Sequence, residues 1–148
     1  MFRLSGVTSS AAKALQARVR STLLTCGYKW PGKAITVNIA QATTARSTTE
    51  LDLPIALSIL AALGKIPKSS IKGTAFLGEL SLDGTIRYTT SSASPPSKLK
   101  RSELSQIKYI FSSTKSQIKN LSNLIGMLSK FPNVDFYKIR FKMPNEPI

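Results

Sequence analysis

The 148-residue sequence has the length of one domain, and its apolar content of 42% is enough to bury a core. It contains no histidine, which excludes histidine triads and histidine metal sites, and its single cysteine, Cys26, excludes an intrachain disulfide. Lysine and arginine number 21 against 7 acidic residues, for a net charge of +14. This charge favours a polyanionic partner such as nucleic acid, with a merely solubilising surface as the alternative.

The first predicted helix follows a serine pair. Ser9 or Ser10 is a suitable N-cap for a helix that starts at Ala11. Apolar residues then recur at helical spacing up to Cys26 and form one buried stripe. Gly27 is expected to end the helix, because glycine readily adopts the positive φ found just beyond helix C-termini. Three basic residues lie off the stripe and are expected to face water or a ligand: Lys13, Arg18 and Arg20.

A strand and a second helix follow. After a turn at Pro31-Gly32, large aliphatic residues alternate with small or polar ones over 34–40, which predicts a strand with one aliphatic face. Asp52 is predicted to be the N-cap of the helix that follows, and Pro54 lies in its first turn, where a missing N–H costs little. This helix is apolar nearly all round, so we expect it to be buried until Gly64 ends it.

The next predicted unit is a hairpin. Segments 74–80 and 85–88 read as strands around the turn dipeptide Asp83-Gly84, which favours positive φ. Glu79 and Arg87 are then expected to face each other as a solvent-exposed pair.

Beyond the hairpin the composition changes. Residues 89–103 are rich in serine, threonine, proline and lysine and are predicted to be a loop or linker between a core at 1–88 and the rest of the same domain at 104–148. That remainder is predicted to hold a strand at 107–111, an amphipathic helix within 116–131 and a last strand at 134–141. The order of elements indicates an α/β (α+β) sandwich, a mixed sheet with helices packed on one face.

Three blocks of sequence carry a family resemblance. They contain Arg18-Val19-Arg20 with Gly27, Pro31, Lys33 and ITVN up to Asn38; then DLPIAL from Asp52; then GELSLDG with Ile86 and Arg87. Their order and spacing resemble the N-terminal domain of the ComM/YifB family of Mg-chelatase-like AAA+ proteins. This resemblance spans about Gly6 to Arg87. It implies a Lon-protease-like domain with the ribosomal protein S5 domain 2-like fold.

The resemblance also implies which positions are structural and where the chain departs from its family. Seven matched residues are expected to serve the fold: Gly27, Pro31, Asn38, Asp52, Pro54, Asp83 and Gly84. The proline and aspartate of the family's loop after ITVN are replaced by Gln41 and Thr43. The sequence contains no Walker A motif, so ATP and Mg²⁺ are expected as cofactors only of a full-length family member, and none for this chain.

Catalysis is not expected in this chain. Lon-like proteases use a serine activated by a lysine, a dyad that needs no histidine. The nucleophile position falls at about Asp52, and the nearest hydroxyl and amine, Ser47 and Lys98, would need unusual loop bends to meet. A degenerate Ser-Lys peptidase is the enzymatic alternative. A divalent cation shared by Glu50, Asp52 and Asp83 is less expected than capping and turn roles, so no metal site is predicted.

A scaffold that assembles into rings or contacts DNA, in recombination and transformation, is what the resemblance implies instead. Tyr28 and Trp30 are candidates for base stacking, although packing is the commoner role of such aromatics. The candidate nucleic-acid-binding residues are the matched Arg18, Arg20, Lys33 and Arg46 and the cluster Lys98, Lys100 and Arg101.

The partners expected are therefore nucleic acid, an AAA+ module or a second copy of the chain. No membrane partner is expected, because no run approaches the roughly 20 apolar residues of a spanning helix. A reducing cytoplasm is the expected location. The remaining alternative is a stand-alone interaction module that joins a partner through its open sheet edge.

Overall fold

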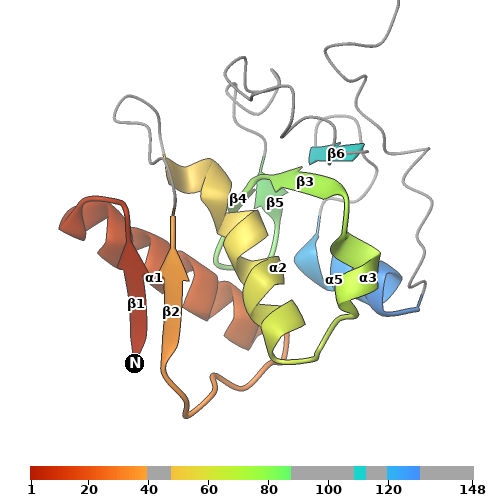
Figure 1. Cartoon of the computed structure of the whole chain (residues 1–148), viewed down its shortest axis with the longest axis horizontal. Coiled ribbons are helices and arrows are strands. Elements are labelled where there is room, and N and C mark those ends of the chain that lie inside the picture. The colour runs from red at the N-terminus through yellow and green to blue at the C-terminus, as the bar shows by residue number, and fades with distance from the viewer. Residues whose placement is uncertain (40–47, 88–108, 113–119, 131–148) are drawn as a thin grey trace, which may run out of the picture.

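A computed structural model describes residues 1–39, 48–87, 109–112 and 120–130. The described chain is mixed α/β (Figure 1), which confirms the predicted fold class at that level. Its elements are β1 (Phe2–Ser5), α1 (Ser9–Thr25), β2 (Ile35–Asn38), the 3₁₀ turn η1 (Thr48–Leu51), α2 (Asp52–Ala62), α3 (Lys68–Ile71), β3 (Thr74–Leu77), β4 (Glu79–Leu80), β5 (Ile86–Arg87), β6 (Tyr109–Ser112) and α5 (Leu121–Lys130).

The N-terminal half is a parallel strand pair crossed by a helix. β1 pairs with β2 in parallel, with Phe2 opposite Ile35 and Ser5 opposite Asn38, and α1 forms the connection between them. The aliphatic side of β2 packs against the core while Thr36 and Asn38 are exposed, so the predicted alternation is confirmed. β1 was not among the predicted strands.

The ends of α1 are set by Thr8 and Gly27. The helix begins at Ser9, and the Oγ1 of Thr8 accepts a hydrogen bond from the N–H of Ala11 at 3.3 Å. The predicted cap at Ser9 or Ser10 is therefore wrong, because Thr8 is the residue whose extended backbone precedes the first turn. Gly27 follows the C-cap residue Cys26 with a φ of 91°, which confirms the predicted stop.

α2 is buried as predicted, but it starts differently. Most of its residues are apolar and inaccessible, and Pro54 lies in the first turn. The N-cap is Leu51, whose backbone is already helical because η1 runs directly into α2. The prediction that Asp52 is the N-cap is therefore wrong, and its side chain is free to bind elsewhere.

The hairpin forms around its predicted turn, but the segment before it is divided. β4 and β5 are antiparallel with Glu79 opposite Arg87, and Gly84 has a φ of 91°. The predicted strand 74–80 splits at Gly78, because β3 pairs in parallel with β6 instead of with β5. Gly78 makes backbone hydrogen bonds with η1 and with the start of α2, as its N–H donates to Glu50 and its C=O accepts from Leu53, both at 3.0 Å.

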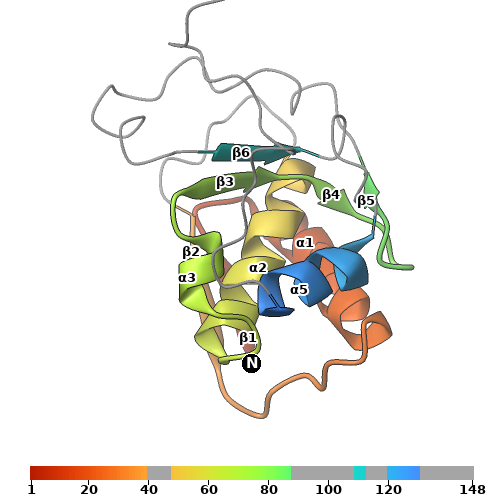
Figure 2. The same ribbon diagram turned by 90° about the vertical axis from the view of Figure 1, so that its right-hand side faces the viewer.

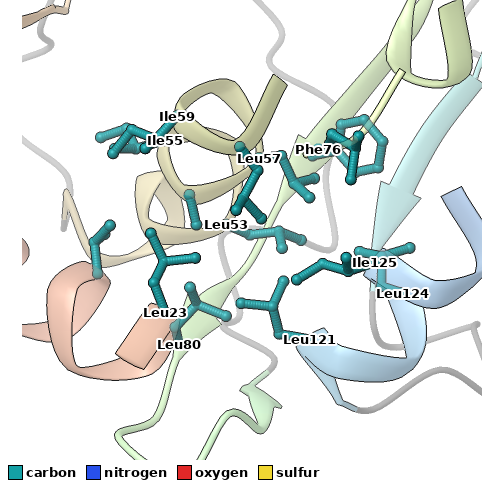
Figure 3. Packing of buried hydrophobic residues seen from close by; sticks show 14 of the residues in the cluster. Leu23, Leu53, Ile55, Leu57, Ile59, Phe76, Leu80, Leu121, Leu124 and Ile125 are labelled. Carbon is teal, nitrogen blue, oxygen red and sulfur yellow. The ribbon is translucent and has the colours of Figure 1, made fainter. Parts of the chain in front are cut away.

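One apolar cluster joins the two halves. Figure 2 shows α2 and α5 on the same side of β3 and β4. Side chains from α1 (Leu23), α2 (Leu57), β4 (Leu80) and α5 (Leu121 and Leu124) meet in this cluster (Figure 3). The predicted C-terminal helix is confirmed over Leu121–Lys130. Within the described ranges, no helix is long and apolar enough to cross a membrane.

The remaining predictions fall outside the described residues. These are the loop or linker at 89–103, the strand at 134–141, the candidate binding residues Arg46, Lys98, Lys100 and Arg101, and the hydroxyl of Ser47.

Candidate functional site

The candidate site lies where α1, α2 and β4 meet, around the carboxylate of Asp52. This side chain has 0% exposure at the start of α2. The Arg18 guanidinium of α1 reaches it with two hydrogen bonds, from Nε to Oδ2 at 2.7 Å and from Nη2 to Oδ1 at 3.0 Å. The backbone N–H of Leu80 in β4 donates a third, to Oδ2 at 3.1 Å. Both carboxylate oxygens are therefore engaged within the protein.

Burial and pairing act on the Asp52 carboxylate in opposite directions. Desolvation raises its pKa above the ordinary value of 3.8, while the hydrogen bonds from Arg18 and from the Leu80 N–H act to lower it. The hydrogen bond to Asp52 raises the pKa of Arg18 in turn, so this arginine is charged at any ordinary pH. The site is thus a buried two-point ion pair that carries a desolvation cost.

This geometry makes Asp52 unsuited to chemistry on a substrate. A nucleophile or base has to reach a reacting atom, whereas the Asp52 oxygens are inaccessible and already bonded. Its neighbour Glu79, in β4, contributes only a weaker Coulombic effect on the pair.

The acidic residues do not gather into a cation site. In the described ranges, no group of three or more His, Cys, Asp or Glu side chains is placed to hold a metal ion, so a cation shared by Glu50, Asp52 and Asp83 has no support. Asp83 instead accepts a hydrogen bond from the N–H of Thr85 at 2.9 Å within the hairpin turn. That bond lowers the Asp83 pKa, and its predicted turn role is confirmed.

Of the predicted nucleic-acid-binding residues, the structure describes Arg18, Arg20 and Lys33, and Arg18 differs from the other two. Arg18 is bound to Asp52 with 21% of its side chain exposed, so the expectation that it faces water or a ligand is wrong. Arg20 and Lys33 are exposed. The Arg20 guanidinium lies 5.8 Å from the centroid of the Trp30 ring, and Trp30 packs on Phe2 with ring centroids 5.1 Å apart. Trp30 is partly buried in this packing.

Two structural residues act at the ends of the β1–β2 pair. Asn38 accepts a hydrogen bond on Oδ1 from the Ser5 hydroxyl at 2.8 Å, which ties the last residues of the two strands together. Gly6, which was not singled out from the sequence, follows with a φ of 92°, and a Cβ there would lie 2.1 Å from the carbonyl oxygen of Ile39. The signal in the sequence is the glycine itself, which directly follows the short segment FRLS.

Comparison with known proteins assigns the chain to a family. Residues 1–121 match the family described as subunit ChlI of Mg-chelatase. The chain belongs to this family. It is 42% identical to competence protein ComM of Haemophilus influenzae over 86 residues, which cover 58% of the chain and 17% of that relative.

Two further relatives of this ChlI-family chain are named YifB. The protein of Salmonella typhimurium is 37% identical and that of Escherichia coli 35% identical, each over 82 residues that make up 55% of this chain. The match covers only 16% of the length of either YifB protein. The resemblance to the ComM/YifB family is thereby confirmed.

Proposed function

We propose that this chain is a non-catalytic, Lon-like domain of a Mg-chelatase-like, ComM-type ATPase. In this proposal the domain has the ribosomal protein S5 domain 2-like fold and serves oligomer assembly and DNA contact in the cytoplasm. ATP hydrolysis would belong to a part of such a protein that this chain does not match. The observation that carries the proposal is the sequestered carboxylate of Asp52.

The non-catalytic assignment depends on what stands at the start of the buried helix. The Lon-like resemblance puts the nucleophile at about Asp52. Here that position holds a fully buried carboxylate, bound at both oxygens by Arg18 and at one of them by the Leu80 N–H. A group held in this way positions α1, α2 and β4, and this supports a structural role.

DNA contact is supported by the charge of the N-terminal half. The whole chain has a net charge of +14. In its N-terminal half, exposed basic side chains occur on β1, on α1 and in the segment that leads to β2: Arg3, Lys13, Arg20, Lys29 and Lys33. Such residues contact phosphates without reading sequence. The relative in Haemophilus influenzae is named a competence protein, which is in keeping with a role on DNA.

A titration with labelled DNA tests this proposal. Fluorescence anisotropy with single-stranded and duplex oligonucleotides should give a Kd on the order of micromolar at about 50 mM salt, and affinity should fall steeply by about 200 mM because counterions are released on binding. Absence of binding at the lower salt concentration would contradict the DNA-contact half of the proposal. Light scattering on the same samples tests assembly, and a strict monomer with and without DNA counts against it.

The alternative of a degenerate Ser-Lys peptidase is tested separately. We expect Ser47→Ala to cleave casein no less than the native chain does, because any cleavage seen in the purified sample would come from a contaminating protease. A reproducible activity that disappears in this variant would restore the peptidase interpretation.

A further inference from the structure

A groove of about 530 Å³ is lined by residues of β2 and α2. One wall is the strand itself with the residues that lead into it, 33–38, and the other is the C-terminal half of α2. The helix contributes Ser58, Ile59 and Ala62, and Leu63 follows its last residue. This volume falls in the range of ligand sites. It can hold a peptide of a few residues but is too small for the surface of another domain.

The strand wall offers backbone groups for pairing. The N–H of Ile35 donates to Met1 at 2.8 Å and that of Ile39 to Ser5 at 3.0 Å, so the odd-numbered residues of β2 face β1. Because successive residues of a strand direct their N–H and C=O to opposite edges, those of Thr36 and Asn38 face the groove. Among the described residues β2 pairs with β1 alone.

The outer edge of β1 is less available. The side-chain amide of Gln16 on α1 donates to the carbonyl of Phe2 at 3.0 Å and so occupies part of that edge. Of the two strands of this pair, β2 is therefore the one whose open edge lies next to the groove.

The remaining lining indicates what the groove accepts. The helix wall is mostly aliphatic, and Leu63 is 37% exposed beside it. Lys33 is the one charged residue of the lining, and it precedes the N-terminal end of β2. Nucleic acid would find a single cation and apolar walls here, so the groove is unsuited to phosphates.

We propose that this groove binds an extended apolar peptide segment of a partner protein, which adds to β2 as an antiparallel strand with its C-terminal carboxylate beside Lys33. Strand addition uses backbone hydrogen bonds for affinity and a neighbouring pocket for side-chain selection. β2 spans four residues, about 13 Å. In an antiparallel pair the C-terminus of the added strand lies at the N-terminal end of β2, where Lys33 supplies the opposite charge. The proposal shares Lys33 with the DNA contact above, but it rests on the open edge of β2 and on the groove beside it.

The test uses the full 148-residue chain and a defined probe peptide. The probe is fluorescein-Val-Thr-Val-Thr-Val with a free carboxylate, compared with the same peptide ending in an amide. The carboxylate form should bind saturably and shift the backbone amide NMR signals of Thr36 and Asn38. The amide form should bind about threefold to fivefold more weakly, as expected for loss of one exposed ion pair, and the same loss should follow from Lys33→Ala.

Variants of the two walls separate strand addition from general attraction. Thr36→Pro removes an N–H that faces the groove and leaves the bonds to β1 intact, and Ala62→Phe fills the groove from an exposed helix position. Each should weaken probe binding by roughly tenfold. Thr36→Val, which retains the N–H, and Lys68→Ala, which removes an exposed charge outside the lining, should bind as the native chain does. Circular dichroism checks each fold, and Ala62→Phe carries the test if Thr36→Pro does not fold.

Four results would overturn the proposal. The first is no saturable binding of either peptide, and the second is unchanged binding in both wall variants. The third is equal loss in Lys33→Ala and Lys68→Ala, which would indicate attraction to net charge. The fourth is slow hydrogen exchange of the Thr36 and Asn38 amides in the free protein, which would show that the edge of β2 is already paired. The strand paired with it would belong to this chain itself, or to a second copy of the chain if Thr36→Pro converts a dimer to a monomer. Thr36→Pro and Ala62→Phe should still bind DNA, so failure of the peptide-binding proposal can be told apart from failure of the proposed DNA contact.

Discussion

Arg18 holds Asp52 by two hydrogen bonds, at 2.7 and 3.0 Å, across 34 positions of sequence. With the N–H of Leu80 as a third donor, one carboxylate fixes the relative positions of α1, α2 and β4. In a buried pair of this kind, the cost of desolvating the two charges offsets much of their Coulombic attraction. Removing a single partner nevertheless leaves an uncompensated charge in the core. The stability of the domain should therefore depend on both residues together.

Arg18→Ala is expected to destabilise the chain by about 3–5 kcal/mol, the range for breaking a buried ion pair by removing one partner. Urea unfolding followed by circular dichroism measures this change. Arg18→Lys should fall between the native chain and Arg18→Ala, because an ammonium group cannot match both carboxylate oxygens as the planar guanidinium does.

The matched control is two positions along the same helix. Arg20 is exposed and stacks near Trp30, so Arg20→Ala should cost no more than about 1 kcal/mol. If Arg18→Ala costs as little as Arg20→Ala, the pair does not fix the three elements. A double variant Arg18→Leu with Asp52→Leu should recover part of the loss, since apolar residues remove the desolvation cost as well.

The pH dependence of stability should carry the signature of Asp52. Desolvation raises its pKa in the folded state above 3.8, so the folded chain binds this proton more tightly than the unfolded chain does. The stability that Asp52 contributes is thus fully present below pH 3.8 and is lost as the pH rises through the folded pKa. We expect the unfolding free energy of the native chain, relative to Asp52→Asn, to fall across this window.

Asp83 provides a control of opposite sign. Its hydrogen bond from Thr85 lowers its pKa, so its contribution is present above 3.8 and is lost as the pH falls through the folded value. Denaturant midpoints of the native chain, Asp52→Asn and Asp83→Asn over a pH series measure both effects. A difference between the native chain and Asp52→Asn that stays flat or grows with pH would show that Arg18 outweighs burial.

The sequence predicts the elements whose signals are local. The stripe of α1, the alternation of β2, the apolar circumference of α2 and the Asp83-Gly84 turn each depend on residues close together in the chain, and each is present. β1 is four residues long and its partner lies 33 positions further on, so no local pattern marks it. The division of 74–80 likewise depends on β6, which lies beyond the hairpin.

The candidate site was only half predictable for the same reason. An aspartate two positions before a proline at the start of an apolar helix is typical of an N-cap. In the structure Asp52 does not cap the helix, because η1 runs directly into α2. Its carboxylate instead binds Arg18, a residue of α1 that is distant in sequence. Helical periodicity places Arg18 off the apolar stripe, but it does not show that another element covers that side of the helix.

Gly6→Ala should destabilise the chain far more than a surface glycine substitution. The φ of 92° is strained for a residue with a side chain, and the added Cβ would lie 2.1 Å from the carbonyl oxygen of Ile39. We expect a loss of at least about 1–3 kcal/mol from the strain alone. Gly32→Ala is the control, because a Cβ at Gly32 meets nothing within 4 Å. Equal thermal midpoints for the two variants would contradict the close approach of Gly6 to Ile39, the residue after β2.

The salt dependence of DNA binding should separate the exposed basic residues from Arg18. Each phosphate contact contributes about 0.9 to the slope of log K against log salt on duplex DNA. If Arg20 and Lys33 contact phosphates, Arg20→Ala and Lys33→Ala should each reduce the slope by about that amount and weaken binding evenly across sequences. Arg18→Gln, measured well below its unfolding transition, should leave the slope unchanged, because in the native chain the Arg18 guanidinium is bound to Asp52 and does not contact phosphate. A reduced slope in Arg18→Gln together with unchanged slopes in the other two would assign the phosphate contact to the buried pair.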